Sequence, residues 1–76
     1  MTEQLSNVLE QNGLTVIGGT NLFQLAETAS ASALNMHLSR NHILTRIFPY
    51  TEKWIRLGLP ANADDLSRLN EALGRF

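Results

Sequence analysis

Apolar residues recur along the chain with two spacings, one typical of helices and one typical of strands. Three segments carry apolar side chains three or four residues apart, as on one side of an amphipathic helix: residues 3–12, 31–40 and 62–76. Four shorter segments are apolar or β-branched and favour strands: residues 14–17, 22–27, 43–48 and 54–59. The expected order is therefore helix, strand, strand, helix, strand, strand, helix.

Residues at the ends of the helical segments support these boundaries. Asn12-Gly13 is a suitable stop for the first helix, because glycine tolerates the left-handed conformation after a helix end. Asn41 is expected to take that left-handed position after the second helix. Asn62, followed three residues later by Asp65, resembles the start of the third helix, with acidic groups favourably placed in the first turn.

This order predicts an α+β fold, in which a small, mostly antiparallel sheet is covered by helices on one face. The 76 residues suffice for one domain with a thin core. The other face of the sheet is then left for a neighbour. The segment 49–53 is expected to be the connection between the last two strands, with an aromatic core or interface patch formed there by Phe48, Tyr50 and Trp54.

Composition narrows the classes of function. The net charge is −1 and the six basic residues are scattered, so a nucleic-acid partner is not expected. There are no cysteines, which excludes disulfides and thiolate metal sites. No apolar run approaches the roughly 18 residues of a membrane span, and the polar N-terminus does not resemble a signal peptide. The expected location is the cytoplasm.

Arg56 is the leading candidate for binding chemistry. It lies between Ile55 and Leu57 in the middle of a predicted strand, where arginine gains little from packing. A guanidinium group suits a planar anion there, because its fork donates two parallel hydrogen bonds to a carboxylate or phosphate. Arg46 repeats the pattern on the preceding strand, so the two groups can converge on one dianion. Two solvated charges on the wet face of an antiparallel sheet are an equal alternative.

The segment Gly18-Gly19-Thr20 has two readings. Its bare backbone amides can approach an anion. It lacks the spacing of a nucleotide-binding loop, however, and no helix follows it directly, so a strand bulge or turn is the favoured interpretation.

The other polar residues are weaker candidates for a functional site. His37 and His42 have no third metal ligand nearby and are expected to be solvated or capping residues. Lys53 is the only lysine, and its polar neighbourhood does not favour the lowered pKa that a covalently reacting lysine needs.

Several segments resemble the C-terminal small domain of the class I/II aminotransferases that depend on pyridoxal phosphate (PLP). The strongest are Ile43–Pro49 (ILTRIFP) and Trp54–Pro60 (WIRLGLP), supported by Gly19–Phe23 and by the helix that ends in Leu38. Within this superfamily the chain is most similar to the threonine-phosphate decarboxylases of cobalamin biosynthesis, with the histidinol-phosphate aminotransferases as near relatives. The resemblance covers nearly the whole chain, most clearly residues 14–73.

The resemblance implies roles for the candidate residues. Arg56 matches the arginine that grips the substrate carboxylate, and Arg46 matches an arginine near the substrate phosphate. Gly19 and Thr20 would line the same cleft between domains. The implied substrate is a small amino acid phosphate, with a carboxylate and a phosphate at opposite ends.

The family's large domain carries the cofactor lysine, the aspartate on the pyridine nitrogen and the phosphate-binding loops, and none of these is present here. Residues 1–76 are therefore expected to be the C-terminal small domain of a longer chain, whose large domain binds PLP. The full-length parent would be a decarboxylating lyase and a homodimer, and the fragment alone would be inactive. A transaminating relative and a free-standing α+β binding module are the alternatives.

Overall fold

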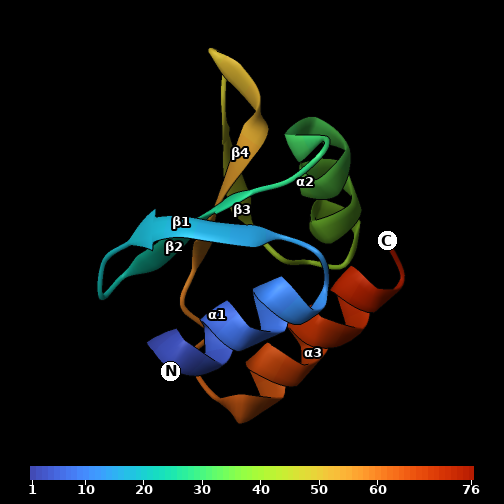
Figure 1. The fold of residues 1–76 in the computed structure, drawn as a ribbon. Coiled ribbons are helices and arrows are strands. Elements are labelled where there is room, and N and C mark those ends of the chain that lie inside the picture. The colour runs from blue at the N-terminus through green and yellow to red at the C-terminus, as the bar shows by residue number, and fades with distance from the viewer.

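A computed structural model describes all 76 residues, from Met1 to Phe76, as three helices and one four-stranded sheet (Figure 1). The helices are α1 (Thr2–Gln11), α2 (Ala31–Arg40) and α3 (Ala63–Gly74). The strands are β1 (Thr15–Gly19), β2 (Phe23–Glu27), β3 (Thr45–Phe48) and β4 (Thr51–Gly58). Neighbours in the sheet order β1-β2-β4-β3 are all antiparallel. The predicted α+β fold and element order are confirmed.

One hydrophobic core lies between the sheet and the helices. Helix α1 packs against β1 and β2, α2 packs against β3 and β4, and α3 packs against both other helices. The strand alternation places Ile55 and Leu57 of β4 in this core, together with Ala26 of β2. The largest fully buried side chains are Leu5, Leu9, Leu34, Leu38, Ile55 and Leu57. The opposite face of the sheet carries no helix.

The β3–β4 hairpin is longer than predicted. The expected connection over residues 49–53 is wrong, because β4 begins at Thr51 and leaves a turn of only two residues, Pro49 and Tyr50. Glu52 and Lys53 are polar, so this part of the strand lacks the alternation of apolar residues on which the prediction was based. The expected aromatic patch stands at this tip, with the Tyr50 ring centroid 5.5 Å from that of Phe48 and 6.2 Å from that of Trp54.

The β1–β2 hairpin contains the bulge that the glycines predicted. The register shifts between Val16 and Gly18, while Gly18 and Gly19 continue β1 instead of interrupting it. The turn itself is formed by residues 20–22.

The helix ends match the predictions from the sequence at two points and differ from them at two. Gly13, with φ of 89°, takes the left-handed position after α1, and the Asn62 side chain accepts a 2.9 Å hydrogen bond from the Asp65 N–H at the start of α3. After α2, however, the left-handed residue is His42, with φ of 62°, and Asn41 keeps a negative φ of −98°. Phe76 was expected to extend the stripe of α3, but it lies beyond the helix end.

Helix α2 receives its N-terminal cap from β4. Ser30 makes no side-chain cap, and the backbone N–H of Ser32 donates instead to the Glu52 carboxylate at 3.1 Å. The hydroxyls of Ser32 and Ser30 donate to the same oxygen. The Ser32 hydroxyl above all, and then the Ser32 N–H, holds the pKa of Glu52 below its ordinary value of 4.5.

Glu52→Gln is expected to lower the melting temperature at neutral pH. Because the folded-state pKa of Glu52 is lowered, its charge stabilises the fold above the unfolded-state pKa, and this contribution is lost as the pH falls through the folded-state pKa. Thermal unfolding followed by circular dichroism should show the wild-type and variant curves converging below about pH 4.5. Glu27→Gln, which changes an exposed carboxylate on β2, is the control and should show no such convergence.

Candidate functional site

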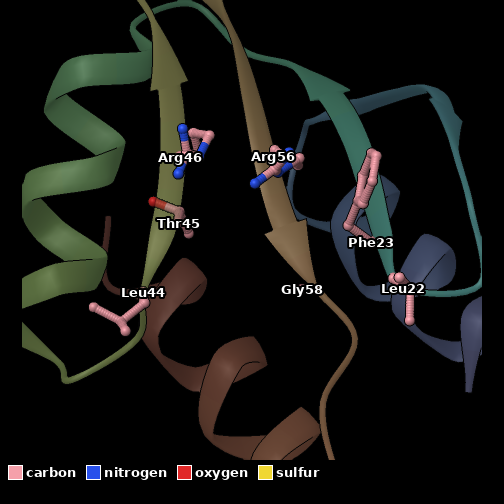
Figure 2. A pocket seen from close by; sticks show the side chains of 7 residues that line it. All are labelled: Leu22, Phe23, Leu44, Thr45, Arg46, Arg56 and Gly58. Carbon is pink, nitrogen blue, oxygen red and sulfur yellow. The ribbon is translucent and has the colours of Figure 1, made fainter.

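The two candidate arginines lie side by side on the open face of the sheet. Arg46 of β3 is the direct cross-strand partner of Arg56 of β4, so both side chains leave the same face. Arg56 alternates with the buried Ile55 and Leu57, so this face points away from the helices. Figure 2 shows both guanidinium groups in front of the two strands.

This arrangement is unfavourable for the chain alone. Like charges directly opposite each other on neighbouring strands are destabilising. The arginine side chains that donate hydrogen bonds within the chain are those of Arg68 and Arg75, and neither Arg46 nor Arg56 is among them. The donors of the pair therefore remain available to an anion from outside, which would also relieve their repulsion.

The two guanidinium groups line one open hollow of about 620 Å³ (Figure 2). It lies between the ends of β2, β3 and β4. The residues that line it are Leu22, Phe23, Leu44, Thr45, Arg46, Arg56 and Gly58. A hollow of this size can hold an anionic group at the arginines together with an adjoining uncharged group.

Phe23 restrains the guanidinium of Arg56. The guanidinium carbon lies 4.8 Å from the centroid of the Phe23 ring, within the range of a cation–π contact. Phe23 is on the neighbouring strand β2, two pairs along the register from Leu25, the direct partner of Arg56, and therefore on the same face of the sheet. This contact fixes the side chain of Arg56 without occupying its hydrogen-bond donors.

Gly19 and Thr20 lie outside this hollow, although they were candidates to line the same cleft. Gly19 is the last residue of β1. A Cβ there would stand 2.6 Å from the backbone oxygen of Phe23, so the hairpin requires a glycine. The Thr20 N–H donates to the same oxygen at 2.8 Å, and its hydroxyl accepts from the Leu22 N–H at 3.0 Å. Both residues shape the turn that places Leu22 and Phe23 at the hollow.

The other polar candidates take structural positions. The Nε2 atom of His37 is 2.6 Å from the carbonyl oxygen of Ala72, in the last turn of α3, so this half-exposed histidine takes a capping position that also joins α2 to α3. The ring of Phe76 covers it, with centroids 5.2 Å apart. Lys53 is exposed on β4 and lines a different hollow from the arginines. No cluster of side chains suited to a metal ion is present.

The sequence indicated the two arginines that line the hollow, but not the uncharged residues Gly58, Leu22 and Leu44 that line it with them. Gly58 carried a detectable signal, because it follows Arg56 by two residues on a strand and must share its face. Leu22 and Leu44 carried none, since an exposed leucine at a strand end has the same pattern as a core leucine.

None of the three helices has the length and apolar character needed to cross a lipid bilayer.

Comparison with known proteins supports the resemblance. No protein-family model matches the chain. A threonine-phosphate decarboxylase from a Sinorhizobium species is 45% identical over 72 residues, and one from Pseudomonas aeruginosa is 38% identical over 75 residues. These matches cover 95% and 99% of this chain but 22% of each relative, so the chain spans about a fifth of their length. The predicted similarity to threonine-phosphate decarboxylases is confirmed.

Proposed function

We propose that the chain is the substrate-binding C-terminal domain of a threonine-phosphate decarboxylase, and that Arg46 and Arg56 bind the two anionic groups of the substrate. The observation that carries the proposal is the direct pairing of the two arginines across β3 and β4. Such a pair costs stability unless a ligand supplies negative charge, and departures from favourable local structure concentrate at functional sites.

Each arginine has a distinct part in this proposal. Arg56, half-buried and stacked on Phe23, binds the substrate carboxylate through a two-point contact. Arg46, on the edge strand and more exposed, binds the phosphate. Two fixed contacts at opposite ends of a small molecule define its orientation, which is how a binding domain assists a reaction whose other groups lie elsewhere.

We propose that the chain has no PLP site of its own. The only lysine, Lys53, is solvent-exposed, and it lines a hollow that contains neither arginine. The cofactor is therefore assigned to another domain of the parent chain, and the 76 residues alone are proposed to bind the substrate without converting it. The names of the two relatives favour decarboxylation over transamination.

Arg46→Thr tests the proposal on the chain itself. Without ligand, the variant is expected to be more stable than wild type by roughly 0.2–1 kcal/mol, because the like-charge pair is removed. If O-phospho-L-threonine binds the wild type with a dissociation constant of about 1 mM, then about 10 mM of it adds about 1.4 kcal/mol. The variant should lose most of this addition. Thermal melts at low ionic strength, with and without the ligand, measure both effects.

The control is Lys53→Thr, which removes one positive charge from the same sheet outside the hollow. It should keep the full response to the ligand. Equal ligand responses of the wild type and Arg46→Thr would contradict the proposed site.

A further inference from the structure

The hollow beside the arginines has a charged end and an apolar end. Arg46 and Arg56 form the charged end. At the other end stand Leu22 and Leu44, whose side chains are 78% and 88% exposed. Gly58 lies between the two leucines (Figure 2).

Neither packing nor backbone geometry requires the glycine at position 58. A Cβ built on Gly58 would meet nothing within 4 Å. Its φ is not positive, so a residue with a side chain fits the backbone. Glycine in a strand sacrifices stability relative to other residues. The missing side chain therefore creates space without contributing to the fold.

That space opens into the hollow. Gly58 alternates with Arg56 along β4, and its cross-strand partner is Phe23, which also lies on the open face. The Phe23 ring does not fill the position above the glycine, because it leans toward Arg56. A slot thus remains above Gly58, next to the guanidinium pair.

We infer that Gly58 is a specificity-determining residue, whose missing side chain admits the alkyl part of a phosphate ester while Arg46 holds its phosphate. This inference rests on the proposed function and adds the class of group that adjoins the phosphate. The exposed side chains of Leu22 and Leu44 flank that group and remove part of its surface from water. A bare inorganic anion uses only the charged end, whereas a branched alkyl phosphate uses both ends.

A graded ligand series tests the slot. The probes are inorganic phosphate, methyl phosphate and isopropyl phosphate, titrated into the 76-residue chain and followed by two-dimensional NMR. Each carbon that is fully buried is worth about a fourfold gain in affinity. With roughly half of its three carbons buried in this open slot, isopropyl phosphate should bind the wild type about tenfold more tightly than inorganic phosphate. Gly58→Val should abolish this gain and leave the affinity for inorganic phosphate within about twofold of wild type.

Two further variants complete the design. Gly58→Ala should lose part of the gain and guards against a folding defect of the valine variant, which a melting curve detects. Gly18→Val is the matched control: position 18 is also an open strand glycine, paired with Leu25 and outside the hollow, so the variant should keep the full gain.

The outcomes separate the two proposals. If isopropyl phosphate shows no gain in the wild type, or keeps its gain in Gly58→Val, the slot is refuted while the anion site stands. If inorganic phosphate does not bind the wild type, or binds Arg46→Thr equally well, the proposed function fails first.

Discussion

Replacing Arg56 by alanine in the parent decarboxylase is expected to lower kcat/KM by about ten- to a hundredfold. A hydrogen bond to a charged group contributes about 1.5–3 kcal/mol, and each 1.36 kcal/mol corresponds to a factor of about ten in rate. The half-buried guanidinium on Phe23 is proposed to make such bonds to the substrate carboxylate. Steady-state release of carbon dioxide from threonine phosphate measures the effect.

Two further variants show whether the loss is specific to the guanidinium of Arg56. Arg56→Lys keeps the charge but loses the fork, so it should restore only part of the activity. Lys53→Ala, a charge removal on the same strand outside the hollow, should leave the kinetics unchanged. Wild-type kinetics in Arg56→Ala would remove Arg56 from the site.

Gly19→Ala is expected to destabilise the fold by about 1–3 kcal/mol, the usual cost of forcing atoms into an occupied space. The new Cβ would stand 2.6 Å from the Phe23 backbone oxygen, and that backbone cannot move without disturbing the β1–β2 turn. For a domain of this size, each kcal/mol lowers the melting temperature by roughly 4–8 °C. Thermal unfolding of the chain measures the loss.

The neighbouring Gly18→Ala is the control, because its Cβ meets nothing within 4 Å. It should unfold within a few degrees of wild type. If Gly19→Ala kept its stability but lost anion binding, Gly19 would belong to the binding site and not to the turn.

The sequence predicted the fold well wherever apolar residues follow one regular spacing. The leucines of α1 and α2 and the alternation around Ile55 fixed the element order and the buried face. The prediction failed where polar residues continue an element, as in the first residues of β4. It also failed at the end of α2, because Asn41 and His42 both tolerate the left-handed conformation, and the chain adopts it one residue later than expected, at His42.

The candidate site could be predicted only in part, because the pattern along each strand does not show how the two strands pair. Alternation along each strand shows that Arg46 and Arg56 lie mid-strand, but their direct pairing depends on the register, which the length of the connecting turn sets. Thr20 and Gly19 were grouped with the arginines on resemblance alone. The local hydrogen bonds of Thr20, and the close approach of the Phe23 backbone to Gly19, account for both residues at this turn.

The position of the two arginine strands in the sheet gives the pair unequal mechanical support. β4 has eight residues and is bonded on both sides, whereas β3 has four residues and is bonded on one side. Backbone in the centre of a sheet opens less readily than backbone at its margin. Arg56 is thus held on the more rigid strand and Arg46 on the more mobile one. We expect Arg46 to adjust its position to anions of different length while Arg56 stays in place.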